Sequence, residues 1–359
     1  MYARKTRLIS ICLILTISLV LSSCSSGYPF KGTDKPIKKA LSYLSEMQAT
    51  DGSIGSYSDT AWAVMALAAC GKNPARFGSP SPIDFLKQNN HQLLDSYNIT
   101  ADLARNVLAI VASGQSPRSF GEGNNVVPGG DFIDALVKLH DGTQFGEKDS
   151  INEDFWALIA LIGAGYSPDD EIITATTSYL LENQGDDNGW SWAIPHNEWY
   201  YESDPDNTAA AIMALIKAGI NPNDERIQKA LAAIETMQGV NGGYVSYGVE
   251  NTSSTAWVMS ALATLDITAS LNGEDDANPV TYILSMQSED GSFMFASPLP
   301  EGYLAMPEKT TADSIIALAG CGYPVERTSN NSWWLWLILT VLIASMITFL
   351  YINTRRRWK

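Results

Sequence analysis

Residues 179–190 read YLLENQGDDNGW, and a related stretch occurs three more times along the chain. The other copies are YLSEMQATDG at 43–52, MQGVNGGY at 237–244 and YILSMQSEDGSF at 282–293. Each copy follows an amphipathic segment with its charges on one face and precedes an almost wholly apolar segment. A unit that returns in this way predicts a repeat architecture, in which neighbouring units bury one another's apolar faces.

The apolar segments identify the inner part of each unit. AWAVMALAAC at 61–70, FWALIALIGA at 155–164 and AAAIMALIKA at 209–218 are examples. Such segments are too short to cross a bilayer, so a helix that is apolar on nearly all sides must be buried in the protein. Most of them end in Gly-x-x-Pro, which stops a helix because Gly takes the left-handed cap and Pro cannot continue.

Outer amphipathic and inner apolar helices therefore alternate six times between residues 36 and 325. We predict an all-α fold, an α6/α6 toroid of six helix pairs in two concentric rings, with a C-terminal transmembrane helix added to it. An open solenoid is the alternative, but it needs polar capping repeats, and neither the first nor the last unit is atypical. Thr-Ala pairs begin several inner segments, as at Thr60, Thr208 and Thr255, where Thr suits an N-cap or first-turn position.

The repeated pattern (aromatic, Leu, three residues, Gln, three or four residues, Gly, one residue, aromatic) resembles the repeat of squalene cyclases and other terpenoid cyclases. Protein prenyltransferase β subunits and the cobalamin-carrying transcobalamins share that toroid. The resemblance covers residues 36–325 and implies a central cavity for an apolar, isoprenoid-like or cobalamin-like ligand. Its implications for function are weaker, because one fold hosts several chemistries.

The same resemblance identifies a candidate catalytic acid. Squalene cyclases protonate an alkene with the middle acid of an Asp-x-Asp-Asp motif that precedes Thr-Ala, and residues 203–209 read SDPDNTA. Asp206 would be the proton donor, with Asp204 as the second acid, but Asn207 replaces the last Asp of the motif. Acids before other inner segments, such as Asp59, are explained by helix capping and the helix dipole. Catalysis therefore stays open, with a terpene-cyclase-like enzyme as one alternative and an envelope polysaccharide-acting toroid as another.

Metal and cofactor chemistry is not indicated. The prenyltransferase zinc site requires Asp-x-Cys, which is absent, and the three histidines fall in unrelated positions. We therefore predict no metal and no cofactor. Cys70 and Cys321 occupy equivalent places in the first and last units, where they are either two small buried thiols or a disulfide.

The longest loop, in the fourth unit, is rich in aromatic residues and is the predicted ligand site. Aromatic rings and carboxylates around a concavity suit a small apolar or cationic ligand. The predicted ligand-binding residues are Trp190, Trp192, Trp199, Tyr201, Asp204, Asp206 and, from the sixth unit, Tyr303. The alternative is that these rings fill the ring centre as packed core.

The distribution of charge excludes one class of partner. Seven of the 23 Lys and Arg residues lie in the two tails, so the middle of the chain carries 39 acids against 16 bases. Nucleic acid is therefore excluded as a partner, because phosphate binding requires a basic surface.

The two ends predict export and a membrane anchor. Basic residues precede an apolar run at the N-terminus, and Leu21–Cys24 resembles a bacterial lipobox in which Cys24 would carry lipid; ordinary cleavage among small residues is the alternative. An uncharged 20-residue run precedes three arginines at the other end, so the positive-inside rule places the body outside the cell membrane. The expected order is a signal peptide (1–24), a linker (25–35), the toroid (36–325), a linker (326–332), a transmembrane helix (333–352) and a cytoplasmic tail (353–359).

Overall fold

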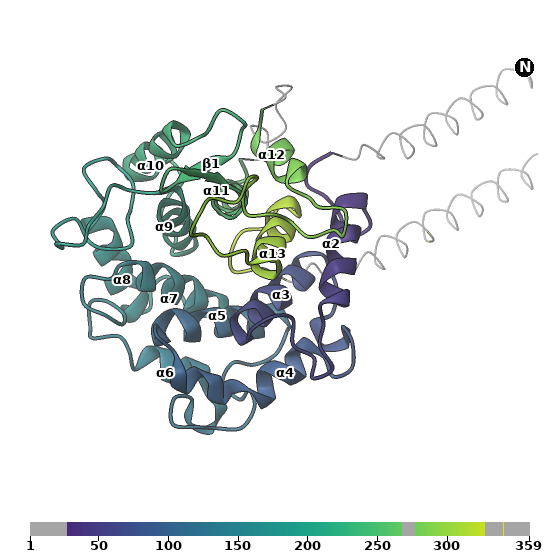
Figure 1. Cartoon of the computed structure of the whole chain (residues 1–359). Helices are drawn as coiled ribbons and strands as arrows, with labels where there is room; N and C mark the ends of the chain where they lie inside the picture. Colours follow the sequence, from purple (N-terminus) through teal and green to yellow (C-terminus); the bar gives the residue numbers. More distant parts are fainter. Residues whose placement is uncertain (1–26, 268–276, 327–339, 341–359) are drawn as a thin grey trace, which may run out of the picture. The chain divides into compact units, whose positions relative to one another are not determined.

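Six inner helices form a closed ring in the part of the chain that the structure describes. The computed structural model describes residues 27–267 and 277–326, together with Thr340. The inner helices are α3 (Tyr57–Ala69), α5 (Ile99–Ala112), α7 (Asn152–Gly163), α9 (Pro205–Lys217), α11 (Thr252–Thr264) and α13 (Pro307–Leu318). Each inner helix packs against the next, and α13 packs back against α3 (Figure 1). This closure excludes the open solenoid.

A second layer of shorter or amphipathic helices surrounds the ring. The outer helices are α2 (Lys35–Glu46), α4 (Pro82–Gln88), α6 (Phe132–Val137), α8 (Glu171–Glu182), α10 (Glu225–Thr236) and α12 (Pro279–Ser285). Three short 3₁₀ turns lie in the connecting loops, namely η1 (Pro74–Arg76), η2 (Asn90–Asp95) and η3 (Pro128–Gly130). Helix α2 packs against α13, so the first and last units meet in the outer layer as well. The described chain thus has the two concentric layers expected from the repeat.

The inner helices end as the glycine signal predicts. Gly165, directly after α7 and its cap residue, has φ 99°, in the left-handed region where a glycine has no steric penalty. The fifth unit has no glycine at this place, and Asp266 adopts φ 57° instead. Asp is one of the few residues that tolerate this conformation, so the degenerate stop signal still ends α11.

The threonine of each Thr-Ala pair is not the N-cap. The capping side chain lies one turn earlier, as for Ser56 before α3 and Asp204 before α9. In four of the pairs the threonine hydroxyl instead accepts the backbone N–H of a loop residue, for example over 3.0 Å from Trp190 to Thr208 and 2.9 Å from Phe293 to Thr311. The threonine of the Thr-Ala pair therefore connects the preceding loop to the inner helix by a hydrogen bond.

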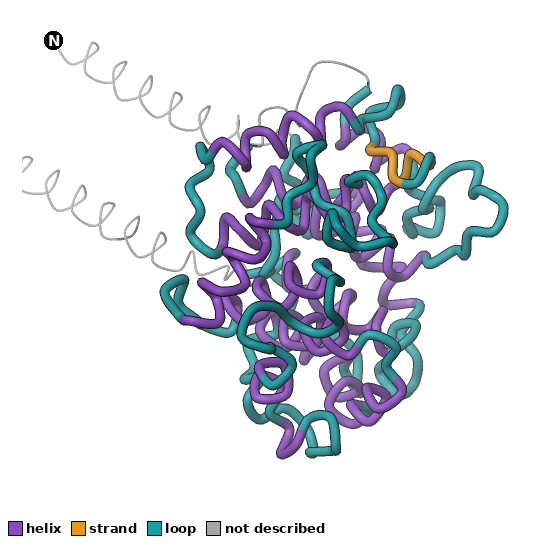
Figure 2. Tube along the Cα trace, turned by 90° about the vertical axis from the view of Figure 1, so that its left-hand side faces the viewer, coloured by secondary structure: helices purple, strands orange, loops and turns teal. Residues whose placement is uncertain are grey.

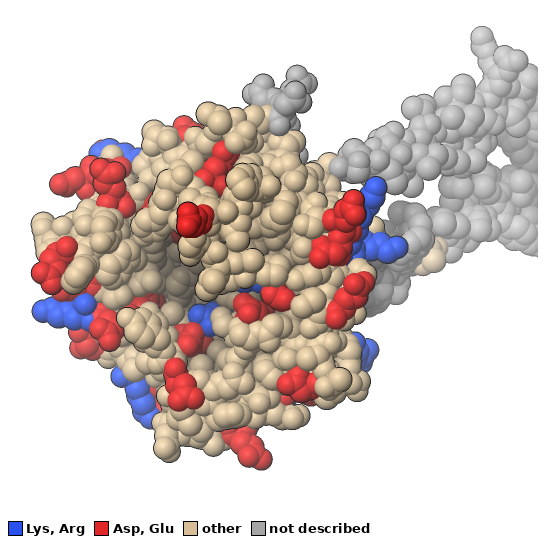
Figure 3. Space-filling view, viewed as in Figure 1, with Lys and Arg blue, Asp and Glu red and all other residues tan. Residues whose placement is uncertain are grey.

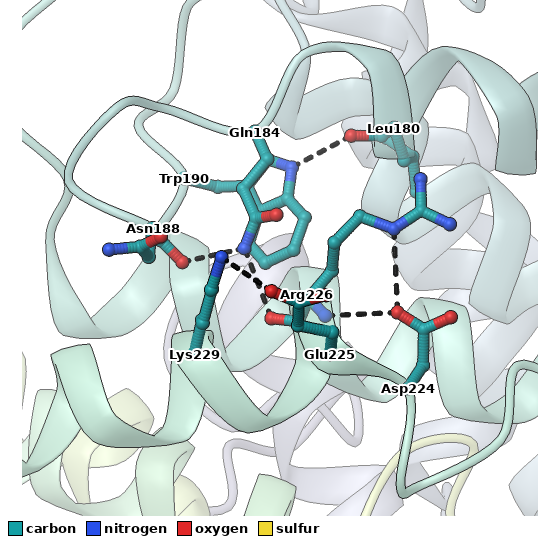
Figure 4. Close-up of polar contacts among 8 residues, drawn as sticks. All are labelled: Leu180, Gln184, Asn188, Trp190, Asp224, Glu225, Arg226 and Lys229. Atoms are coloured by element: carbon teal, nitrogen blue, oxygen red, sulfur yellow. Dashed lines mark hydrogen bonds and ion pairs between the residues drawn. The ribbon is translucent and has the colours of Figure 1, made fainter.

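The repeated glutamine connects one unit to the next. The Gln184 amide nitrogen donates to Asn188 O within its own loop over 2.7 Å and to Arg226 O in α10 over 3.1 Å (Figure 4). In the sixth unit the Gln287 amide nitrogen donates over 2.9 Å to Pro36 O in α2. The glutamine of the last unit therefore contributes to closing the outer layer onto the first helix.

We expect Gln287→Ala to lower the free energy of unfolding by about 1–3 kcal/mol, because two carbonyl groups lose a donor. These are Pro36 O and Gly291 O. Urea unfolding followed by circular dichroism measures the change. Gln228→Ala is the matched control, since the Gln228 amide makes one exposed, local hydrogen bond to Pro222 O. An equal loss in both variants would show that the hydrogen bond between the last and first units stabilises the fold no more than an exposed local hydrogen bond does.

The prediction of an all-α fold was wrong. A two-stranded antiparallel sheet, β1 (Tyr244–Ser246) and β2 (Val249–Asn251), precedes α11, and Figure 2 shows it as a short hairpin at one edge of the molecule. The two residues between the strands, Tyr247 and Gly248, have φ 48° and 76°. Positive φ at both central residues is typical of the tight turn whose twist matches an antiparallel pair. The fifth loop therefore folds back on itself before its inner helix begins.

The prediction that the fold includes a membrane-spanning helix was also wrong for the described chain. Among these residues, none of the helices combines the length and the apolar character needed to cross a bilayer. The expected helix at 333–352 lies outside the described residues except for Thr340, as do the tail and the expected signal peptide with Cys24. Export, lipidation at Cys24 and a location outside the cell membrane stay predictions.

Candidate functional site at the centre of the ring

A cavity of about 470 Å³ opens where the inner helices begin. Figure 3 shows a hollow in the middle of this face of the molecule, with acidic and basic side chains around it. Five of the six inner helices, or the residues just before them, contribute to the wall. The lining residues are Ser56, Ser58, Asp59, Trp62, Ala101, Arg105, Asn152, Trp156, Trp257, Met306 and Lys309. A cavity of this size suits a ligand of a few hundred daltons.

Three tryptophans form the floor of this central cavity. The ring centres of Trp156 and Trp257 are 4.7 Å apart, and Trp62 lies 5.9 Å from Trp156 and 6.2 Å from Trp257. Most of these pairs are edge-to-face, the arrangement that aromatic quadrupoles favour. Buried Tyr323 contacts both Trp62 and Trp156 edge-to-face, at 5.9 and 5.5 Å. The aromatic cluster therefore closes the ring centre and leaves the cavity above it.

Sequence analysis missed these tryptophans, although their positions follow a simple rule. Trp62 and Trp257 each follow a Thr-Ala pair directly, and Trp156 follows the equivalent pair of residues in α7. That position faces the ring axis, and Asp102 and Asp313 occupy it in α5 and α13. Alignment of the six inner helices on Thr-Ala would have revealed a tryptophan, an acid or alanine at one level of the axis.

Two cations line the cavity beside the tryptophans. The Arg105 guanidinium lies 5.7 Å from the ring centre of Trp62 and pairs with Asp102 over 2.6 Å. The Lys309 ammonium lies 5.1 Å from Trp62 and pairs with Asp313 over 2.5 Å. The side chain of Asp313 is fully buried, and this burial raises its pKa despite the neighbouring lysine. The expected site was a concavity lined by aromatic rings and carboxylates. The cavity in the structure also contains two basic side chains.

Asp206, the predicted proton donor, interacts with one of these two cations, Lys309. Its Oδ1 is buried and has no hydrogen-bond partner among the described residues. Burial and the neighbouring Asp204 carboxylate raise the pKa of Asp206 to about 7, although Ser254 and Lys309 act in the opposite direction. The Asp204 carboxylate instead caps α9, since it accepts from the backbone N–H and the side-chain amide of Asn207 over 2.9 and 2.7 Å. Asp204 thus has a structural explanation, and Asp206 does not.

The predicted aromatic residues are distributed over several environments. Trp190 is completely buried, and its indole N–H donates to Leu180 O over 2.9 Å (Figure 4). Trp192 is half-buried, whereas 58% of Trp199 is exposed. Tyr303 stacks on Phe295 with 5.6 Å between the ring centres. None of these four residues lines the central cavity.

The hairpin brings one further aromatic residue to the predicted site. Burial raises the pKa of the Tyr247 hydroxyl, and the nearby groups Asp204, Asp206 and Tyr201 raise it further. Tyr247 lies at the tip of the hairpin and is 66% exposed. The structure therefore places Tyr201, Asp204 and Asp206 near one another and adds Tyr247, which sequence analysis did not single out.

Other reactive groups give no sign of a metal centre. In the described ranges, no group of three or more His, Cys, Asp and Glu side chains is arranged to hold a metal ion. Cys70 and Cys321 are both free thiols, so the structure contains no disulfide between the first and last units. Burial raises the pKa of both thiols, to about 12 and about 11.

Comparison with known proteins identifies the fold. No protein-family model and no curated protein sequence matches this chain. The structure is similar to that of the type II terpene cyclase MstE from Scytonema in its apo form, with a TM-score of 0.53, 16% identity, and coverage of 79% of this chain and 96% of the cyclase. It is also similar to a glycosidase in complex with glucose, with a TM-score of 0.56, 12% identity, and coverage of 79% and 94%.

These likenesses place the chain among the terpenoid cyclase-like α/α toroids as a fold. The resemblance drawn from the repeated pattern is thereby confirmed. At such low identity the likeness extends to the fold alone. The fold is compatible with binding in a central cavity or with cyclase-like chemistry, and the side chains at the ring centre have to distinguish between them.

Proposed function

We propose that this protein binds a sugar-sized polar ligand in its central cavity. The observation that carries the proposal is the composition of the cavity wall, in which an indole floor is surrounded by Ser58, Asn152, Arg105 and Lys309. Indole surfaces pack against the C–H faces of a sugar, and the polar groups around them provide partners for hydroxyls. The glucose bound to the structurally similar glycosidase is consistent with this class of ligand.

An isoprenoid chain suits this wall less well than a sugar does. An apolar chain over the floor would cover Arg105 and Lys309 without offering their remaining N–H groups an acceptor, and burying an unsatisfied donor is unfavourable. A cobalamin-like ligand would extend well beyond a 470 Å³ cavity. A sugar unit avoids both difficulties, since every face of it carries either C–H groups or hydroxyls.

Tryptophan fluorescence tests the proposal directly, because three indoles form the cavity floor. We expect glucose or a short glucan to change the emission saturably. Asn152→Ala should weaken binding about 5- to 10-fold, the value of one lost hydrogen bond. The Asn152 amide oxygen already accepts from Ser150 over 3.0 Å, so its amide nitrogen is the group available to a ligand. Asn223→Ala, in the loop before α10, is the control and should leave affinity unchanged. Absence of any saturable response with both sugars would overturn the proposal.

Acid catalysis is the second candidate function, and it is favoured by the buried Oδ1 of Asp206, which has no hydrogen-bond partner among the described residues. Burial and the neighbouring Asp204 carboxylate raise the pKa of Asp206 well above its usual value, so this acid can hold a proton and could protonate an alkene. Cyclisation returns the proton when the final cation loses one, so the product is an isomer of the substrate. Geranylgeranyl dihydroxybenzoate, the substrate bound in a variant of MstE, is the probe.

If Asp206 is the acid, the probe gives a product of equal mass and different retention time, and Asp206→Asn reduces the rate about 10²- to 10⁴-fold. Asp204→Asn is a poor control because Asp204 caps α9, so Asp186→Asn, at an exposed acid of the fourth loop, serves instead. A stable probe after prolonged incubation at pH 6 would exclude this candidate. Binding of glucose without conversion of the probe would leave the binding function in place.

A further inference from the structure

Two basic side chains converge on a single indole in a protein whose formal net charge is −16. Arg105 comes from α5 and Lys309 from α13, the two inner helices on either side of α3, and both lie over Trp62 of α3. Two like charges near one ring repel each other unless negative charge is close by. The placement of these two cations side by side in the wall of the central cavity therefore needs an explanation.

The neighbouring acids account for only part of this positive charge. Asp102 pairs with one arm of the Arg105 guanidinium and also accepts from the Ser96 hydroxyl. Arg105 Nε is buried and has no partner in the described part of the chain. Arginine has five N–H donors in a planar fork, so the contact with Asp102 does not satisfy it.

Three other acids lie near the cavity. Asp206 interacts with Lys309, but burial raises the pKa of Asp206 and favours its neutral form. Asp59 is held away from the two cations, and Asp313 lies behind one of them. The Asp59 carboxylate accepts from the backbone N–H and hydroxyl of Ser56, over 3.0 and 2.7 Å, as the reciprocal cap of α3. Asp313 lies beneath Lys309 and is fully buried, so a ligand meets the ammonium group and not the carboxylate. Lys309 itself is 22% exposed and lines the cavity.

The backbone around the cavity adds to this local field. Inner helices begin at the cavity, and each start carries a partial positive charge from its unpaired N–H groups. Trp62 supplies a flat surface beneath both cations. The region therefore combines two basic donors, helix starts and an aromatic face within one cavity.

We propose that Arg105 and Lys309 receive an anionic group of the bound ligand, a carboxylate or a phosphate, while its sugar ring lies over the tryptophan floor. This inference rests on the proposed binding function and specifies the ligand as an acidic or phosphorylated sugar. Arginine recognises either group through two parallel hydrogen bonds, and lysine adds a point charge. Carboxylate and phosphate share this chemistry, and the probes below distinguish them.

The test compares four probes by tryptophan fluorescence and calorimetry: glucose, glucuronate, glucose 6-phosphate and inorganic phosphate. We expect glucuronate or glucose 6-phosphate to bind at least 10-fold more tightly than glucose, with an affinity that falls as salt is added. The tighter of the two identifies the anionic group. In the double variant Lys309→Met/Asp313→Asn, the preference for the charged sugar over glucose should fall at least 5-fold.

The double variant avoids leaving Asp313 buried without its partner, and thermal unfolding checks that it is folded. Lys229→Met is the matched control, because Lys229 makes an equivalent pair with Glu225 one turn away, over 2.8 Å, on the outer helix α10 (Figure 4). Lys309→Arg keeps the charge and should keep the preference.

The outcomes separate this inference from the proposed function. Equal affinity for glucose and the two charged sugars would overturn the inference and leave sugar binding intact. Binding of phosphate, glucuronate and glucose 6-phosphate with equal affinity, and no binding of glucose, would support an anion site and overturn the sugar function. Failure of all four probes would overturn both.

Discussion

Replacing Trp190 with Ala is expected to lower the free energy of unfolding by about 3–5 kcal/mol, the range for removing a large aromatic side chain from a packed core. Trp190 is completely buried, and its indole N–H donates to Leu180 O in α8. Its backbone N–H donates to Thr208 in α9 over 3.0 Å. The residue therefore joins an outer helix, a loop and an inner helix.

Chemical denaturation with guanidinium measures this loss, and Trp199→Ala is the matched control. Trp199 belongs to the same loop but is 58% exposed, so its removal should change stability by no more than about 0.5 kcal/mol. Trp190→Phe should recover part of the loss, because it keeps most of the buried area without the N–H donor. A small effect of Trp190→Ala would mean that the loop does not need this ring, and would return Trp190 to the group of candidate ligand residues.

Replacing Asp154 with Thr is expected to stabilise the protein at alkaline pH by about 3–5 kcal/mol. Asp154 occupies the place in α7 that threonine takes in other units, and its Oδ1 accepts the Phe145 N–H over 2.7 Å. Its Oδ2 is buried without a partner among the described residues, and burial raises the pKa of Asp154 to about 8. Threonine keeps the acceptor and removes the charge.

The direction of the pH effect follows from proton binding. In the folded protein Asp154 holds its proton up to about pH 8, whereas in the unfolded chain it loses the proton near pH 3.8. The unfolded state therefore binds fewer protons between these values, so the contribution of Asp154 to stability is largest at or below about pH 4 and falls as pH rises towards 8. Urea unfolding of wild type and Asp154→Thr at pH 4, 6 and 8 should show a gap that widens with pH.

The control for this experiment has the opposite sign. Asp141 is an exposed carboxylate that accepts from the N–H groups of Gln144 and Thr143, and these bonds lower its pKa. Asp141→Asn should therefore reduce stability most at neutral pH, and the loss should shrink as pH falls below 3.8. A constant gap between wild type and Asp154→Thr at all three pH values would show that Asp154 is charged in the folded protein.

Three local signals allowed the fold to be predicted from the sequence. Apolar segments such as residues 61–70 had to be buried, glycine signals marked their ends, and the repeated loop showed that the unit recurs. Each of these signals acts within a few residues, so no knowledge of distant contacts was required. The hairpin at residues 244–251 escaped prediction, because its strands are three residues long and its turn carries Tyr247 before Gly248 in place of a common turn pair.

The candidate site could be predicted from the sequence only in part. The fourth loop is conspicuous in sequence because its aromatic residues are close together along the chain, yet Trp190 is packed as core and Trp199 is largely exposed. Asp206 was singled out from its motif, and its buried, unpaired oxygen lends that choice physical support. Its neighbours Lys309 and Asp313 come from a helix about 100 residues further along.

The sequence by itself determined which segments are helices, which of them are buried, and that the units repeat, because local periodicity and end signals decide these properties. Only the tertiary structure decided which side chains share the cavity. Trp62, Trp156 and Trp257 are far apart along the chain and meet because closure of the ring directs one position of each inner helix to a common axis. Arg105 and Lys309 lie over the same indole, that of Trp62, for the same reason. Two basic residues that are about 200 positions apart in the sequence are therefore neighbours in the cavity.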